Sequence, residues 1–271
     1  MIEAKVIEDS TYEGGKRLTT FQLKYQRFIH SEMMTHRVFS RNASSSRAIP
    51  VAKMLQQVYE DPAMPVEWGK NQPGMQAREN FEGEELESVE ASWRLAAKLA
   101  AGAAEALMES GVHKQITNRL LEPFQWIHVV VTATEWDNFF ALRDHPDAQP
   151  EIRELARAMK TAMAASTPRV LGFGEWHLPY LDDAERLGLP LKDQIACSVA
   201  RCARVSYLRH DLTAPSVEDD KTLHDRLVLA VPPHMSPTEH QATPTLDTNK
   251  EANLRGWMQY RRLIEVGEEE C

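Results

Sequence analysis

The chain has 271 residues, of which 42% are hydrophobic and 26% are charged, and its formal net charge is −9. This composition is typical of a globular protein, and no apolar run approaches the ~20 residues that a helix needs to cross a bilayer. The acidic balance argues against a protein that coats nucleic acid, because such proteins neutralise many phosphates with cationic side chains. We therefore expect neither a membrane nor a nucleic acid as partner.

Cysteine and histidine spacing argues against a disulfide framework and against a metal site. The three cysteines are Cys197, Cys202 and Cys271, and the spacing of the first two matches neither a redox pair nor a zinc pair. Buried structural thiols are the favoured interpretation. The N-terminus lacks the basic start and apolar centre of a signal peptide, so we expect a cytoplasmic location.

In the first half of the chain, strand patterns are followed by helical ones. Residues 3–8 and 17–25 alternate apolar and polar side chains as strands do, and two glycines supply the turn between them. Helical spacing follows over 28–39, while 59–83 is rich in Pro, Gly, Asn and Glu, as long surface loops are. An Ala- and Leu-rich helix over 84–110 ends at a glycine.

In the second half, helical patterns dominate. A β-branched run at 126–134 predicts a buried strand, and helices are expected over 135–146 and 150–166. Two further helices are expected over 191–207 and 216–230. The chain has no internal repeat, and the fold class is α+β, with helices surrounding a short sheet.

Cationic and hydroxyl side chains gather in the segment MTHRVFSRNASSSRAIP, residues 34–50. Arginine binds phosphate with bidentate geometry, and serine hydroxyls with backbone N–H groups can complete an anion cradle. In an acidic chain, such a cluster suits one small anionic ligand held in a pocket. A solvated basic turn explains the same residues, so the segment alone leaves both interpretations open.

Three blocks of sequence carry a family resemblance. The triplet THR at 35–37 is followed after seven residues by Ser45, TATEWDNFFALRDHPDAQPEIRELA occupies 132–156, and GVHKQITNRLLEP occupies 111–123. Together they resemble the signature blocks of the flavin-dependent thymidylate synthases. The resemblance implies that family's fold, a short and mostly antiparallel sheet surrounded by helices.

A fourth block lies at a different place in the chain order. CARVSY at 202–207 and HMSPTEH at 234–240 resemble segments with which the family begins, yet here they lie near the C-terminus. The resemblance therefore implies a circular permutation, which a core tolerates when the original ends meet at the surface. We expect one catalytic domain over 1–271. Its parts are 17–165, similar to the family's central and C-terminal part, 196–243, similar to its N-terminal part, and 166–195, a new connection.

The resemblance also implies an activity. Its cofactor is FAD, its co-substrates are NADPH and methylenetetrahydrofolate, and the family assembles as a homotetramer with active sites between subunits. A one-carbon unit is transferred to carbon 5 of dUMP, with the hydride supplied by reduced FAD. Two alternatives stay open. One is a related methyltransferase or hydroxymethyltransferase acting on dCMP or UMP, and the other is a catalytically silent protein that binds nucleotide or flavin.

The family's roles carry over onto particular residues. We expect Arg143 to stabilise negative charge on the pyrimidine ring and His234 to orient the carbon donor, so these are the predicted catalytic residues. The predicted nucleotide-binding residues are Glu32, Arg37, Ser44, Ser45, Ser46, Arg47, Arg119 and Arg143. The predicted flavin-binding residues are Thr35, His36, Arg37, Asn138, Ser206, Ser236 and Glu239.

Four residues depart from the family pattern. Thr35 replaces the first arginine of the triplet, Ala43 stands where a glutamate is usual, and Thr132 and Thr134 replace an Asn and an Arg. These exchanges suggest either a compensating rearrangement or a changed ligand, because unpaired charges in such a site are costly.

Structural roles compete with several assignments. Asn138 could cap a helix, His234 could be a solvated loop residue, and Arg143 could pair with Asp144 or Asp147. Three aromatic residues are expected to belong to the core rather than to a cofactor stack, namely Trp136, Phe139 and Phe140.

Overall fold

A five-stranded sheet forms the centre of the computed structural model, which describes residues 1–206, 213–247 and 250–267. Its strand order is β3-β4-β2-β1-β5. The strands are β1 (Glu3–Thr11), β2 (Leu18–Gln26), β3 (Ser40–Ala43), β4 (Trp126–Ala133) and β5 (Arg169–Val170). Neighbouring strands are antiparallel except β1 and β5, which are parallel. The α+β class with a mostly antiparallel sheet is confirmed.

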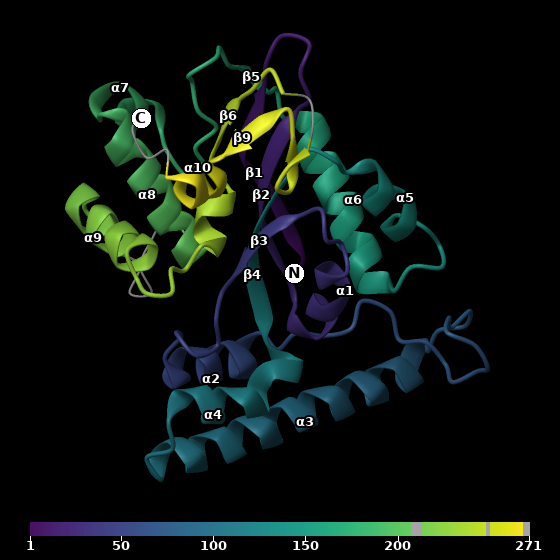
Figure 1. Cartoon of the computed structure of the whole chain (residues 1–271). Coiled ribbons are helices and arrows are strands. Elements are labelled where there is room, and N and C mark those ends of the chain that lie inside the picture. The colour runs from purple at the N-terminus through teal and green to yellow at the C-terminus, as the bar shows by residue number, and fades with distance from the viewer. Residues whose placement is uncertain (207–212, 248–249, 268–271) are drawn as a thin grey trace.

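Three groups of helices surround the sheet (Figure 1). One side carries α5 (Asp137–Arg143) and α6 (Pro150–Ala165), and the other carries α7 (Asp183–Gly188), α8 (Leu191–Arg204), α9 (Val217–Val228) and α10 (Tyr260–Val266). Across one end lie α2 (Val51–Glu60), α3 (Gly83–Glu109) and α4 (Lys114–Thr117). Among the described residues, no helix is both long and apolar enough to cross a membrane.

Short elements complete the chain. They are η1 (Arg27–Ile29), α1 (His30–Met34), η2 (Asn118–Phe124), η3 (Ser236–Glu239), β6 (Ala242–Pro244), β7 (Lys250–Glu251), β8 (Leu254–Arg255) and β9 (Trp257–Gln259). Two small antiparallel sheets pair β6 with β9 and β7 with β8.

One face of the central sheet is apolar and packs against α6. Alternate residues of a strand point to the same face, so Phe21 and Leu23 of β2 lie beside Val129 and Val131 of β4. This face joins the apolar side of α6 in the largest core cluster. Trp136 and Phe139 are buried in that cluster and Phe140 packs against it, which confirms their assignment to the core.

The opposite face carries a chain of buried hydrogen bonds. His177 Nδ1 lies 2.9 Å from Ser10 Oγ, and its Nε2 lies 2.7 Å from Thr20 Oγ1. Thr20 Oγ1 is hydrogen-bonded to Thr132 Oγ1 at 2.7 Å, and Thr132 Oγ1 to His240 Nδ1 at 2.8 Å. All five residues are fully buried. These contacts attach the C-terminal half of the chain to the sheet.

The segment between β2 and α3 differs from expectation. In place of one helix over 28–39, the chain forms η1, α1 and a turn, and then enters β3. The helix ends early because the guanidinium of Arg41 donates to the carbonyls of Met33, Met34 and His36, which satisfies carbonyls that further helix would have paired. Helix α2 was not predicted, because its pattern adjoins the serine-rich loop.

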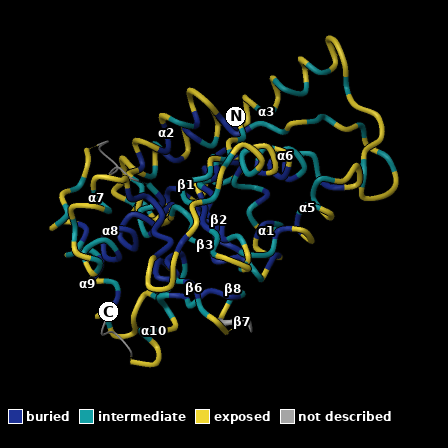
Figure 2. Tube along the Cα trace, turned by 90° about the horizontal axis from the view of Figure 1, so that it is seen from above, coloured by how far each residue is buried: buried dark blue, intermediate teal, exposed yellow. Residues whose placement is uncertain are grey.

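Two other expectations concern burial. Cys197 and Cys202 are buried free thiols, as expected, and burial raises the pKa of Cys197 to about 12. Cys271 and Tyr207 lie outside the described residues. The stretch 166–195, expected as a new connection, contains β5 and α7 and buries Trp176 within a core cluster. Figure 2 shows buried stretches of chain in the middle of the molecule and α3 exposed along much of its length.

The buried histidines predict loss of stability in acid. Burial lowers the pKa of His240 to about 3, and burial with the charges of Arg186 and Arg169 holds the pKa of His177 well below its usual range. In the unfolded chain both histidines become protonated near pH 6.5, so above that pH their protonation does not reduce the free energy of unfolding. Below it, stability falls by about 1.4 kcal/mol per pH unit for each histidine.

Urea unfolding measured over this pH range tests the prediction. His240→Gln, which keeps hydrogen-bonding atoms but does not titrate, should reduce the pH slope of the unfolding free energy by one proton. The matched variant His113→Gln, at an exposed position, is the control for the loss of a surface histidine. An unaltered slope in His240→Gln would contradict the prediction.

Candidate active site

Arg143 contacts the THR triplet. It lies at the end of α5, where its Nε donates to His36 Nε2 at 2.9 Å and its Nη2 donates to Thr35 Oγ1 at 3.2 Å. The competing surface pairs do not form, because Asp144 binds Arg157 and Lys160 while Asp147 binds Arg78. His36 and Arg143 are 107 positions apart in the chain, so two distant sequence blocks meet at one guanidinium.

His36 is held as a neutral imidazole. Because its Nε2 accepts a hydrogen bond from Arg143, Nδ1 carries the ring proton. The ring is buried, stacks on Phe39 and meets the edge of Phe139. Burial, reinforced by the charges of Arg143 and Arg41, lowers the pKa of His36 to about 4. The imidazole thus orients Arg143 without adding a second positive charge.

Glu32 adds a carboxylate close to this guanidinium. Burial raises the pKa of Glu32, the charge of Arg143 opposes that rise, and the charge of Glu151 reinforces it. One carboxylate oxygen, Oε2, is buried without a hydrogen-bond partner among the described residues. An unsatisfied buried acceptor is costly, so this oxygen marks a place where a ligand donor would be stabilised.

The serine-rich loop meets η2 at a second group. Ser46 Oγ, Arg27 Nη2 and Arg119 Nη1 all donate to Oε1 of Glu122, at 3.3, 3.1 and 3.4 Å respectively. The amide of Asn118 holds the loop in place by donating to the carbonyls of residues 46 and 49, at 2.7 and 3.0 Å. A carboxylate therefore lies within the predicted phosphate cradle.

A third group joins β3 to the C-terminal blocks. The amide of Asn42 donates to the carbonyl of Cys202 at 2.7 Å, and its oxygen accepts from Ser236 Oγ at 3.1 Å. Glu239, at the end of η3, forms an ion pair with Arg261. The blocks that contain Cys202 and Ser236 thus lie against β3, which follows the triplet.

Other predicted residues lie at the surface. Arg37, Ser45, Arg47, Arg119, Asn138, His234 and Ser236 are exposed, and Ser206 is half-buried beyond the end of α8. Ser44 Oγ accepts from the backbone N–H of His128 at 3.2 Å. Among the described residues, no hydrogen bond or ion pair links the Arg143 group to the Glu122 group.

The pairing of β3 with β4 explains this separation. The two strands are antiparallel, with Ser40 opposite Thr132 and Ala43 opposite Val129. Residues before β3 therefore lie near the end of β4, where α5 presents Arg143, and residues after β3 lie near its start, where η2 presents Glu122. The four residues of β3 put roughly 13 Å between these ends.

Sequence reasoning missed three polar residues that organise these groups. Arg41 and Asn42 lie inside the serine- and arginine-rich segment, but their roles depend on which carbonyls approach them in space. Glu122 lies in the LEP run beside the predicted arginine, where its charge could have been noticed. Its convergence with Ser46, however, is a long-range contact.

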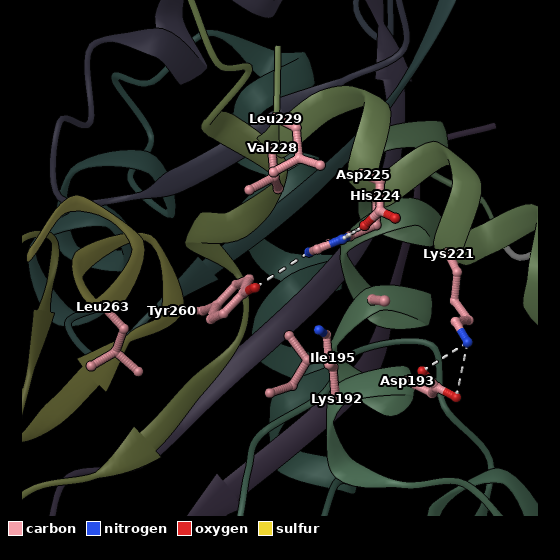
Figure 3. A pocket seen from close by; sticks show the side chains of 11 residues that line it. Lys192, Asp193, Ile195, Lys221, His224, Asp225, Val228, Leu229, Tyr260 and Leu263 are labelled. Carbon is pink, nitrogen blue, oxygen red and sulfur yellow. Dashed lines mark hydrogen bonds and ion pairs between the residues drawn. The ribbon is translucent and has the colours of Figure 1, made fainter. Parts of the chain in front are cut away.

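A cavity of about 420 Å³ lies elsewhere, between α8, α9 and α10 (Figure 3). Its buried floor includes Ile195 and Val228, and its His224 lies between Asp225, at 3.0 Å, and the hydroxyl of Tyr260, at 3.3 Å. None of the predicted site residues lines this cavity. Among the described residues, no group of three or more metal-ligating side chains could hold an ion.

Comparison with known proteins gives a family and many similar structures. Two of these structures are of a UMP/dUMP methylase, PolB from Streptomyces cacaoi. The complex with 5-Br dUMP is 22% identical, has a TM-score of 0.46, and covers 55% of this chain and 67% of that one. The complex with 5-Br UMP is 19% identical, has a TM-score of 0.49, and covers 60% of this chain and 89% of that one. No curated protein matches the chain.

The family model described as thymidylate synthase complementing protein matches residues 17–169. That range includes the THR triplet, the Glu122 group and Arg143, and it covers more than half of the chain. The chain therefore belongs to the thymidylate synthase complementing proteins, the flavin-dependent thymidylate synthase family that its signature blocks resemble.

Proposed function

We propose that this protein is a flavin-dependent enzyme that transfers a one-carbon unit to carbon 5 of a pyrimidine nucleoside monophosphate. The observation that carries the proposal is the contact of Arg143 with His36 and Thr35 within a chain of this family. The more specific proposal is the thymidylate synthase reaction, with dUMP as acceptor, methylenetetrahydrofolate as carbon donor and NADPH as reductant.

The charges of the Arg143 group suit a pyrimidine ring that becomes electron-rich. A fixed guanidinium stabilises negative charge that develops on the ring, and the neutral His36 keeps that guanidinium oriented. Ser45, Ser46, Arg47 and Arg119 would hold the phosphate. No side chain would need to attack the base, because FAD, once reduced by NADPH, would supply the hydride.

The residues around the triplet fit a flavin. The exposed Arg37 and Ser236 and the unpartnered buried oxygen of Glu32 offer both charge and hydrogen-bonding capacity. We assign flavin binding to Thr35, His36, Arg37, Asn138, Ser206, Ser236 and Glu239. His234, exposed in the loop before η3, is our candidate for orienting the carbon donor.

Two departures from the family pattern have structural explanations that favour a compensating rearrangement. Thr132 belongs to the buried hydrogen-bond chain, and Thr134 Oγ1 accepts from the backbone N–H of Arg255 at 3.2 Å. Both therefore hold the C-terminal part of the chain against the sheet. The contact of Asn42 with Cys202 and Ser236 supports the proposed circular permutation within one domain.

A changed acceptor is the second candidate. Thr35 gives the triplet a neutral hydroxyl where the family has a guanidinium, and that hydroxyl accepts from Arg143. A pocket with one positive charge fewer could favour a different pyrimidine nucleotide, such as UMP or dCMP, or the transfer of a hydroxymethyl group.

We also propose a homotetramer with active sites between subunits. The phosphate cradle and the Arg143 group lie at opposite ends of β3 in one chain, so a site between subunits would bring the cradle of one to the Arg143 of another. Leu95 and Leu99, one turn apart on α3, are 57% and 67% exposed, as residues that become buried between subunits can be.

Thermal protection by nucleotides tests the acceptor. A ligand that binds only the folded chain raises its melting temperature, so dUMP should protect the protein, with UMP and dCMP compared in the same assay. AMP is the purine control and should protect far less. Equal protection by AMP, or no protection by any pyrimidine monophosphate, would refute a pyrimidine nucleotide site.

Arg143→Lys tests the role of the guanidinium. It keeps the positive charge but loses the paired contacts with His36 and Thr35, so we expect turnover to fall by about 100-fold. Tritium release from carbon 5 of labelled dUMP measures it. The control is Arg157→Lys, on the neighbouring helix α6, which changes an arginine paired with Asp144 and should remain active. Wild-type turnover in Arg143→Lys would exclude the proposed role.

Mixed oligomers test the location of the site. Arg143→Met should lack the group that faces the base, and Arg47→Met should lack a group that holds the phosphate, so each alone should be inactive. If the two groups of one site come from different subunits, co-assembled variants contain sites with both arginines, and activity should reappear. A mixture no more active than its components would place both groups of a site in one chain.

A further inference from the structure

Glu122 is an anion built into the cradle assigned to the substrate phosphate. Its Oε1 accepts from one hydroxyl and two guanidiniums, those of Ser46, Arg27 and Arg119. We propose that Glu122 is a specificity-determining residue, which restricts the site to phosphate monoesters that carry two negative charges. This inference rests on the proposed function, because it takes the cradle to be the phosphate site.

The donors are already arranged around an anion. Ser46 is buried, and its loop is fixed by the amide of Asn118, so its hydroxyl has little freedom to seek another partner. The side chain of Arg27 is 20% exposed and is likewise held at the carboxylate. Carboxylate and phosphate oxygens accept the same charge-assisted hydrogen bonds, so the two compete for the same donors.

The carboxylate has room to give way. The side chain of Glu122 is 27% exposed, and that of Arg119 is 61% exposed, so both border solvent. A carboxylate that moves toward water regains hydration, which lowers the cost of its displacement. A ligand phosphate can therefore take over the donors without leaving a buried charge unpaired.

The charge of a phosphate decides whether it can displace the carboxylate of Glu122 from its donors. The guanidiniums of Arg27 and Arg119 bring two positive charges to Glu122, whose carboxylate brings one negative charge. A phosphate monoester carries about −1.5 to −2 at neutral pH, more than the carboxylate that it displaces, so the two guanidiniums hold it more strongly. A phosphodiester carries one negative charge, as the carboxylate already does, and gains little by replacing it. A nucleoside has no charge with which to compete.

A neutral variant of the same shape isolates this effect. Glu122→Gln keeps an oxygen that accepts hydrogen bonds but removes the negative charge, and Glu109→Gln, at an exposed position on α3, is the matched control. Isothermal titration calorimetry would measure the affinities of dUMP, its 5′-methyl phosphodiester, deoxyuridine and inorganic phosphate. Circular dichroism melting verifies that each variant folds, and Glu122→Asp, which keeps the charge, is the second variant.

The wild-type protein and Glu109→Gln should prefer dUMP to its methyl ester by about tenfold or more. In Glu122→Gln the methyl ester should bind about tenfold tighter, so that the preference largely disappears, whereas Glu122→Asp should retain it. An unchanged preference in Glu122→Gln, or a loss of dUMP affinity there, would overturn the inference.

The inorganic phosphate measurements separate this inference from the proposed function. If dUMP binds well and the preference survives in Glu122→Gln, the inference fails while the nucleotide site stands. If Glu122→Gln changes the affinity for phosphate but dUMP binds no better than phosphate, the inference stands and the pyrimidine site fails. If no anion binds, both fail.

Discussion

The antiparallel pairing of β4 with β3 is the constraint on which the site depends. It places the segments flanking β3 beside the segments flanking β4, in reverse order, so the triplet meets α5 and the serine loop meets η2. A shift of one residue in this register would turn Asn42 of β3 to the other face and remove its bonds to Cys202 and Ser236. These contacts of Asn42 therefore favour the register that places the triplet beside Arg143.

In both groups of the candidate site, the arginine has a neighbour that is neutral or negatively charged, which limits the local positive charge. At Arg143 the neighbouring imidazole is neutral, because burial and two arginines disfavour its protonation. At the serine loop, the carboxylate of Glu122 occupies the donors directly. Guanidiniums held in this way are oriented before a ligand arrives, which reduces the free energy lost to ordering on binding. The proposed anion site would thus need no large positive surface in an acidic protein.

The C-terminal half of the chain holds the central sheet together. Its histidines, His177 and His240, satisfy hydroxyls of three strands, and its residues Ser236 and Cys202 meet Asn42 of β3. Thr132 and Thr134, which depart from the family pattern, serve these attachments.

The sequence alone determined the elements whose patterns are long and regular, namely β1, β2, β4, α3, α6, α8 and α9, since alternation and helical periodicity arise locally. It also indicated the family, because the signature blocks within residues 17–169 keep enough of their pattern to be recognised. Only the tertiary structure decided the early end of α1, the pairing of β3, and the partners of Arg143 and Glu122. Each of these rests on atoms far apart in the chain, and local propensity carries no information about which distant carbonyl or carboxylate will approach.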